Sequence, residues 1–210
     1  MKEIVLFSMS SYENKNIANW ILENLEDNFT FIKDPFDEIN WKFGKKRIAK
    51  QDDSLIIYNI EDKEINTGIN ELKEKSLDYS ENKGNKNLVL VLQDPYNLFA
   101  DRFDFQNSIQ NKSTKNWMSR SFFNCWKNHA KEVNQPSVIN LIINYNQWTI
   151  SQKYRNFIAQ KLDLSNKNDN FHNVKSLKKY KKYKYDKKFM SLFDRDTNKL
   201  AEDIFRWKIK

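Results

Sequence analysis

Four short apolar runs stand out along the chain, at residues 4–7, 55–60, 88–92 and 138–143. All are rich in Val, Ile and Leu and show little alternation with polar residues. Such runs are typical of strands covered on both faces, as in a parallel sheet. A shorter run, Thr30–Ile32, predicts an additional edge strand.

Between these runs, apolar residues recur at helical spacing, and Pro95 favours a helix start. The final pattern places Leu200, Ile204 and Trp207 on one helix face. Strands alternating with helices favour an α/β sandwich around a mainly parallel sheet. We expect one domain over residues 1–210, because no repeat or long linker divides the chain. The predicted helices cover residues 17–25, a polar stretch after Gly68 through Leu77, and residues 95–103, 117–133, 154–162 and 197–207.

In such sheets, ligands bind beyond the carboxyl ends of strands, where the next helix offers free N–H groups. Two predicted turns occupy such places, Ser8–Asn16 after the first run and Gln93–Asn97 after the third. In the first turn Ser10 and Ser11 offer hydroxyls and Lys15 offers a positive charge. The alternative interpretation of this turn is an ordinary N-capping loop.

Composition predicts a folded, soluble and cytoplasmic protein. Hydrophobic residues make up 39% and aromatic residues 14% of the 210 residues, enough for a core. No apolar run approaches the roughly 20 residues that cross a bilayer, so we expect no membrane partner. The run Ile4–Phe7 is too short for the core of a secretion signal.

Metal and classical nucleotide-loop motifs are absent from the sequence. One cysteine, Cys125, and two histidines argue against a disulfide framework and a zinc site, so no metal is predicted. The three glycines do not form a GxxxxGK or GxGxxG pattern. Within the predicted helix 117–133, we interpret His129 as a packed or surface residue and Cys125 as a buried apolar one.

The positive charge is concentrated near one end of the chain. Residues 171–190 contain eight lysines and one aspartate, which gives +7 of the formal net charge of +8. Three tyrosines interleave with the run Lys175–Lys188. This lysine- and tyrosine-rich loop, at about 172–190, is either a solvated loop or a site for nucleic acid or another polyanion. The lysines expected to contact a polyanion are Lys178, Lys179, Lys181, Lys182 and Lys184.

One segment resembles a known family. Residues 88–103, LVLVLQDPYNLFADRF, resemble the signature strand-to-helix segment of sulfotransferases, which reads roughly (R)DPxNxxAS(R). The order downstream is also similar, with a strand at 138–143, a tyrosine-containing turn at 144–148 and a helix at 154–162. The resemblance covers about residues 3–163 and is closest to small sulfotransferase-like proteins of bacteria and their phages.

The resemblance implies a P-loop-kinase-like three-layer sandwich with a mainly parallel central sheet flanked by helices. It also implies sulfuryl transfer from 3′-phosphoadenosine 5′-phosphosulfate to a hydroxyl or amine acceptor. Such a reaction mainly needs two anions held in place and charge stabilised on the transferring oxygens. If the protein is active, we expect Ser10, Ser11, Lys15 and Arg102 to contact the donor. Glu61 is then the candidate acceptor base, with simple surface acidity as the alternative.

The sequence departs from the family pattern at the donor contacts. Gln93 stands where the family has arginine, and Asp101 where it has serine. An amide lacks the bidentate fork of arginine, and an aspartate repels a phosphate. Ser11-Tyr12-Glu13 replaces a lysine or arginine followed by Ser-Gly, and Lys178–Tyr185 replaces a glycine- and serine-rich loop.

Three hypotheses about function follow. The first is a working sulfotransferase with unusual donor contacts, using 3′-phosphoadenosine 5′-phosphosulfate. The second is a catalytically inactive relative, a pseudoenzyme, that acts as a binding or structural protein. The third is a polyanion or nucleic-acid binder that uses Lys175–Lys188. The departures favour lost or altered activity, and they name neither an acceptor nor a protein partner.

Overall fold

The computed structural model describes residues 2–9, 14–25, 28–33, 55–75, 86–103, 112–165 and 193–205. Its strands are β1 (Lys2–Ser8), β2 (Phe29–Lys33), β3 (Leu55–Glu61), β4 (Lys86–Leu92) and β5 (Leu141–Asn144). Its helices are α1 (Asn14–Glu23), α3 (Ile65–Lys75), α4 (Pro95–Phe103), α5 (Lys112–Asn134), α6 (Tyr145–Ile150), α7 (Gln152–Leu162) and α10 (Arg195–Phe205). No helix within these ranges is long and apolar enough to span a membrane.

The strands form one five-stranded sheet in the order β2-β3-β1-β4-β5, and every described pair is parallel. β1 is therefore the central strand. Its last residue, Ser8, lies opposite Glu61 of β3, and Phe7 lies opposite Leu90 of β4. The expected edge strand at Thr30–Ile32 is present as β2.

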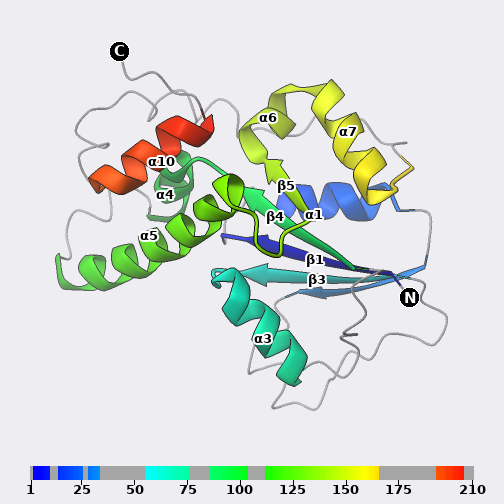
Figure 1. Ribbon diagram of the computed structural model, residues 1–210, viewed down its shortest axis with the longest axis horizontal. Coiled ribbons are helices and arrows are strands. Elements are labelled where there is room, and N and C mark those ends of the chain that lie inside the picture. Colours follow the sequence, from blue (N-terminus) through cyan, green and yellow to red (C-terminus); the bar gives the residue numbers. More distant parts are fainter. Residues whose placement is uncertain are drawn as a thin grey trace.

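The sheet is covered by helices on both faces, which makes three layers (Figure 1). Alternate side chains of a strand point to opposite faces. Val5 and Phe7 thus belong to the cluster with α3, α4, α5 and α10, whereas Ile4 and Leu6 belong to the cluster with α1, α6 and α7. The predicted α/β class and the parallel sheet between helices are confirmed.

Three predicted boundaries were wrong. The run at 138–143 becomes a strand only at Leu141, because Ser137 still binds back to Glu132 through N–H···Oε2 at 2.9 Å. The helix expected after Gly68 begins at Ile65, and the Gly68 N–H already donates to the carbonyl of Glu64. The expected turn at 144–148 is largely helix α6, whose N-cap is Asn144.

The other predicted helices lie within or close to observed ones. Helix α1 begins at Asn14 and ends at Glu23, so Leu25 follows it. The predicted helix 117–133 lies within α5, and the helix starting at Pro95 is α4. Helix α10 is Arg195–Phe205, and Trp207 lies outside the described residues.

Candidate functional site at the carboxyl edge of the sheet

The strand order creates one favoured position for a ligand. β1 and β4 are neighbours, but α1 after β1 and α4 after β4 cover opposite faces of the sheet. Ligands of open α/β sheets bind in the crevice at such a switch point, outside the carboxyl ends of the strands. Both turns singled out in the sequence, 8–16 and 93–97, start at this edge, and residues 10–13 of the first lie outside the described ranges.

Asp94 forms the N-cap of α4. Its Oδ1 accepts the N–H of Asn97 at 2.9 Å, and its carbonyl accepts the N–H of Leu98 at 3.2 Å. Pro95 follows as the first helical residue, where proline is favoured because it has no N–H to satisfy. The carboxylate of Asp94 therefore already occupies the N-terminus of α4, and an incoming anion would have to compete with it for the free N–H groups there.

The same carboxylate joins α4 to α6. Asp94 is fully buried, and its Oδ2 accepts the side-chain amides of Asn97 at 2.7 Å and Asn146 at 2.8 Å. The amide oxygen of Asn146 in turn accepts the Asp94 N–H at 3.4 Å. A buried charge is stable only when it is satisfied in this way. We therefore assign Asp94 a structural role in fixing the β4–α4 turn.

Gln93, which stands where sulfotransferases have arginine, is 1% exposed. Its backbone carbonyl oxygen accepts the indole N–H of Trp126 in α5 at 2.9 Å. No pattern in the sequence indicates this contact, because the two residues are 33 positions apart. The residue at position 93 is thus buried beneath α5 and neutral.

Tyr96 connects this turn to α10. Its hydroxyl donates to Oδ1 of Asn198 at 2.7 Å. Burial, followed by the nearby carboxylates of Asp94 and Glu202, raises the pKa of Tyr96 to about 12. The ring also packs edge-on against Phe193, just before α10, at 4.8 Å between centroids. Helix α10 is therefore attached directly to the start of α4.

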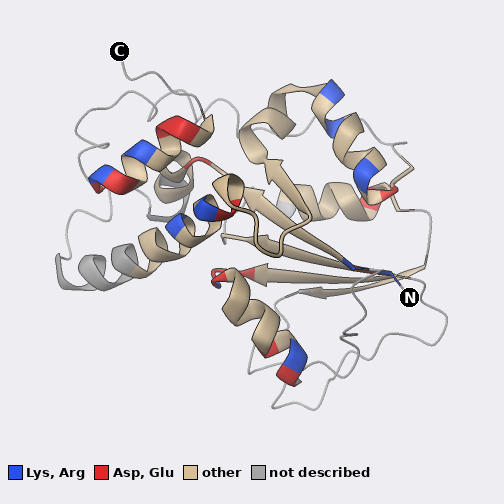
Figure 2. Cartoon of the chain, viewed as in Figure 1, with Lys and Arg blue, Asp and Glu red and all other residues tan. Residues whose placement is uncertain are grey.

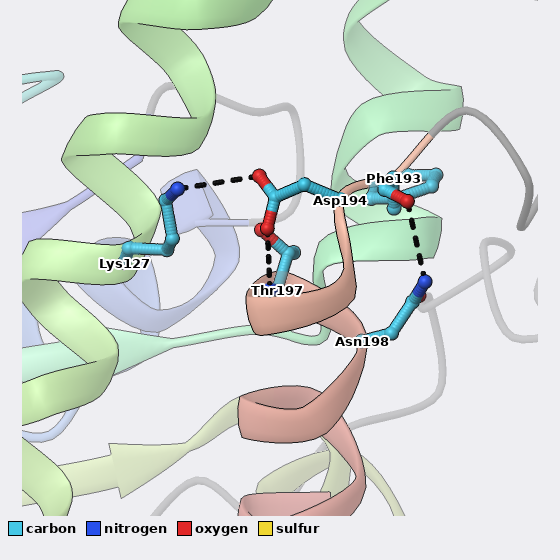
Figure 3. A network of polar contacts seen from close by, with 5 residues as sticks. All are labelled: Lys127, Phe193, Asp194, Thr197 and Asn198. Carbon is cyan, nitrogen blue, oxygen red and sulfur yellow. Dashed lines mark hydrogen bonds and ion pairs between the residues drawn. The ribbon is translucent and has the colours of Figure 1, made fainter.

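A second set of contacts fixes the start of α10 (Figure 3). Oδ1 of Asp194 accepts the N–H of Thr197 at 2.8 Å, and Oδ2 pairs with Nζ of Lys127 in α5 at 3.2 Å. The side-chain amide of Asn198 donates to the carbonyl of Phe193 at 3.3 Å. These contacts hold α10 against α5.

Acidic residues lie at the end of β3 and directly after it, at the same edge. Glu61 accepts the side-chain amide of Asn59 at 3.1 Å, and Asp62 has a positive φ of 58°. The Asp62 N–H donates to the carbonyl of Ser8 at 2.9 Å. Ser8 itself is 2% exposed, and its Oγ has no hydrogen-bond partner among the described residues. Figure 2 shows acidic colouring at the end of β3 and at the turn before α4.

His129 of α5 supports the turn after β3. It is fully buried, and its Nε2 lies 2.8 Å from the carbonyl oxygen of Lys63. Burial lowers its pKa, and this effect outweighs the hydrogen bond to Lys63 and the carboxylates of Asp62 and Glu132. Cys125 is buried, as predicted, with Sγ 3.8 Å from the same ring nitrogen. Sequence reasoning left the place of His129 open and missed its contact with Lys63.

The residues expected to contact the donor are only partly placed. Glu61 lies at the carboxyl edge, Lys15 in the first turn of α1 and Arg102 in the last turn of α4. The side chains of Lys15 and Arg102 are not described, and Ser10 and Ser11 lie outside the described ranges. The expected polyanion contacts, which also lie outside them, are Lys178, Lys179, Lys181, Lys182 and Lys184. Across the described part of the chain, no group of three or more His, Cys, Asp or Glu residues is placed to hold a metal ion.

Comparison with known proteins finds a structural likeness. No family model matches the sequence, and no curated protein matches it. Among solved structures, the chain is similar to a mouse sulfotransferase complexed with PAP, at 12% sequence identity and a TM-score of 0.48. The similarity covers 97% of this chain and 83% of that chain.

Proposed function

We propose that this protein is a sulfotransferase-like protein whose donor site no longer supports ordinary sulfuryl transfer, and that it acts by binding. If it binds a nucleotide, the class is that of 3′-phosphoadenosine 5′-phosphosulfate. The acceptor or protein partner is unassigned. This proposal combines the family resemblance of residues 88–103 with the chemistry of the carboxyl edge.

The observation that supports lost activity most strongly is the state of Gln93. It stands where sulfotransferases have arginine, it is buried, and its backbone carbonyl accepts the indole N–H of Trp126. An arginine there would offer two parallel N–H donors to a phosphate, whereas a neutral amide offers neither the charge nor the fork. The position can therefore contribute little to holding a dianion.

The surrounding charges point the same way. The described turns after β3 and β4 carry the carboxylates of Glu61, Asp62 and Asp94. Lys63, in the turn after β3, forms an ion pair with Glu71 at 2.6 Å. Like charges a few ångströms apart repel by about 1 kcal/mol in water and by more when partly buried. A nucleotide with several phosphates would meet this repulsion.

The decisive experiment is calorimetry with 3′-phosphoadenosine 5′-phosphate, the spent donor, supported by a thermal-shift measurement. We expect no binding at millimolar ligand and physiological salt. A ligand present at a hundred times its Kd would stabilise the folded protein by about 2.7 kcal/mol, which a thermal shift detects easily. Micromolar binding would overturn the proposal and restore a working donor site.

Two variants make the result specific. If the wild-type protein binds, Arg102→Ala and Lys15→Ala should weaken binding strongly, because these are the cations expected to contact the donor. Unchanged affinity in both would show that the ligand sits elsewhere. Asn70→Ala, on the exposed side of α3, is the matched control.

A second candidate function rests on the charge distribution. Residues 171–190 hold +7 of the net +8, and tyrosines interleave with Lys175–Lys188. Lysines neutralise phosphates and aromatic rings stack on bases. We therefore also propose binding of single-stranded nucleic acid or another polyanion, independent of the carboxyl edge.

Fluorescence anisotropy with a labelled thymidine 20-mer tests this second candidate. If Z phosphates are neutralised, log K should fall with log salt concentration at a slope of about −0.7Z. Replacing Lys178, Lys179, Lys181, Lys182 and Lys184 by Gln should abolish both the binding and the salt slope. Binding that persists in this variant, or whose affinity does not depend on salt concentration, would contradict the second candidate function.

A further inference from the structure

The turn between β3 and α3, residues 61–64, is held by contacts from two neighbouring elements. The Asp62 N–H donates to the Ser8 carbonyl of β1 at 2.9 Å. From α5, His129 contacts the Lys63 carbonyl at 2.8 Å, and Oδ1 of Asn128 accepts the Ile65 N–H at 3.4 Å. Two of these three contacts thus come from adjacent residues of one helix.

The turn is not in a relaxed conformation by itself. Asp62 has φ 58°, in the left-handed region that a non-glycine residue occupies at a cost. Such a conformation persists when surrounding contacts hold it. The contacts from Ser8 and His129 flank Asp62 directly, so they are the contacts that stabilise it.

The hydrogen bond to Lys63 defines the proton on His129. A carbonyl oxygen only accepts, so Nε2 must carry the hydrogen and Nδ1 is the unprotonated nitrogen of the neutral ring. Nδ1 is buried and has no hydrogen-bond partner among the described residues. A proton added to Nδ1 would place an N–H and a positive charge in an interior that offers them no acceptor.

We propose that His129 is a pH-sensitive latch: in its neutral form it holds the 61–64 turn closed at the carboxyl edge, and its protonation opens that turn. Opening lets solvent reach the ring and frees Glu61 and Asp62 from their fixed positions. The residue therefore acts on the edge through the turn. The latch does not depend on the proposed loss of sulfuryl transfer, because it concerns the turn alone.

The charged groups near the His129 ring do not cancel the lowering of its pKa by burial. Asp62 on the turn and Glu132 on α5 both favour the charged ring, but burial disfavours it more strongly, so the pKa of His129 is lowered from its ordinary 6.5. Glu132 is also held by Ser137, whose hydroxyl donates to it at 2.6 Å. Lys63 on the turn contacts Glu71, and the thiol of Cys125 on α5 lies 3.8 Å from Nε2.

The sign of the pH dependence follows from the lowered pKa. Above pH 6.5 the ring is neutral in both the closed and the open turn, so the latch is fully effective. As the pH falls below 6.5, the open turn takes up a proton more readily than the closed turn. Between pH 7.5 and 5.5 the equilibrium constant for opening should therefore rise by up to about tenfold.

Hydrogen exchange of the full-length protein tests the latch. The readout is the protection of the Asp62 and Ile65 amides, corrected for the intrinsic effect of pH on exchange. In the wild-type protein we expect this protection to fall from pH 7.5 to 5.5, by up to about tenfold. Unchanged protection over that range would overturn the proposal.

Two variants separate His129 from other titrating groups. His129→Gln keeps an amide N–H at the position of Nε2 but takes up no proton, so its turn should show the same protection at both pH values. His172→Gln removes the other histidine of the chain and should behave as the wild-type protein. A fall in protection of the same size in His129→Gln would overturn the proposal.

If His129→Gln does not fold, a measurement on the wild-type protein still tests the latch. Nitrogen NMR of labelled histidine, assigned with His172→Gln, follows the protonation of Nδ1 directly. We expect His129 to titrate below pH 6.5 together with the loss of protection at Asp62 and Ile65. Titration with an unchanged turn, or an opened turn with a neutral His129, would overturn the latch.

Discussion

The indole N–H of Trp126 donates to the carbonyl oxygen of Gln93 at 2.9 Å, and both residues are almost completely buried. This bond joins α5 to the residue that follows β4, one position before Asp94, the N-cap of α4. Position 93 is therefore held by a buried hydrogen bond between distant parts of the chain. A change in Trp126 should disturb the candidate site and the core together.

Trp126→Phe tests this bond. Phenylalanine fills much of the space of the indole but has no N–H, so the buried Gln93 carbonyl loses its indole donor. An unsatisfied buried acceptor costs about 1–3 kcal/mol, and the smaller ring adds a cavity term. We expect the free energy of unfolding, measured in urea, to fall by about 2–4 kcal/mol. A loss below about 0.5 kcal/mol would show that the bond is unimportant.

The close approach of α3 to the sheet gives a second prediction. A Cβ added at Gly68 would lie 2.8 Å from Cε1 of Phe7 and 3.3 Å from Cγ2 of Ile60. Alanine is intrinsically better in a helix by about 1 kcal/mol, but forcing atoms into a packed core costs about 1–3 kcal/mol. We expect Gly68→Ala to lower the free energy of unfolding by about 1 kcal/mol.

Two further variants identify the cause. Asn70→Ala, at an exposed position of the same helix, should leave the stability unchanged or raise it slightly. Adding Phe7→Leu to Gly68→Ala removes the ring that clashes, so the two changes should cost less together than the sum of their separate effects. Simple additivity would contradict the packing explanation.

Much of the sheet could be predicted because its strands are buried on both faces. A strand such as Leu55–Glu61 is buried along nearly its whole length, and its apolar run, interrupted only by Asn59 before the final Glu61, is visible in the sequence. Boundaries were missed where tertiary contacts decide them. Gly68 suggested a helix start, yet α3 begins at Ile65, and Gly68 lies inside it where the helix comes close to Phe7. Val138 belongs to an apolar run but is 38% exposed, since the chain is still turning there.

The candidate site was predictable in position but not in detail. Parallel strands put all their carboxyl ends at one edge, so the turns at 8–16 and 93–97 could be placed there from the pattern alone. The partners of individual side chains could not be foreseen. Trp126 and Gln93 meet only because α5 crosses the end of β4. Asp94 likewise contacts Asn146, which lies 52 positions away in the sequence.

Tyr96 gives a prediction about alkaline pH. Its pKa is raised from 10.0 to about 12, chiefly by burial, so the folded protein holds its phenol proton more tightly than the unfolded chain. The stability that this provides is fully present below pH 10 and is lost as the pH rises towards 12. Tyr96→Phe should therefore lose stability less steeply than the wild-type protein between pH 10 and 12.

Urea unfolding of both proteins at pH 8, 10 and 11.5 provides the measurement. At pH 8 the variant should be less stable by about 1 kcal/mol, because the hydroxyl no longer donates to Asn198. The difference should shrink as the pH rises. A constant difference at all three pH values would show that Tyr96 titrates equally in the folded and unfolded states.

Asp194 should stabilise α10 as an N-cap and as a charge. Burial raises its pKa, but hydrogen bonds from Thr197 and Lys127 outweigh this and lower the pKa below its usual 3.8. Asp194→Ala should lower the free energy of unfolding by about 1 kcal/mol at pH 7, as loss of an N-cap does. Asp194→Asn keeps a capping oxygen and loses only the exposed ion pair with Lys127, so it should cost less, about 0.5 kcal/mol.

The cost of Asp194→Asn should also depend on pH. A carboxylate with a lowered pKa contributes its stability above pH 3.8 and loses it as the pH falls further. The difference in the free energy of unfolding between wild type and Asp194→Asn should therefore narrow towards pH 2.5. Asp196→Asn, exposed in the same helical turn, serves as the control, and an equal loss in that variant would contradict a specific role for Asp194.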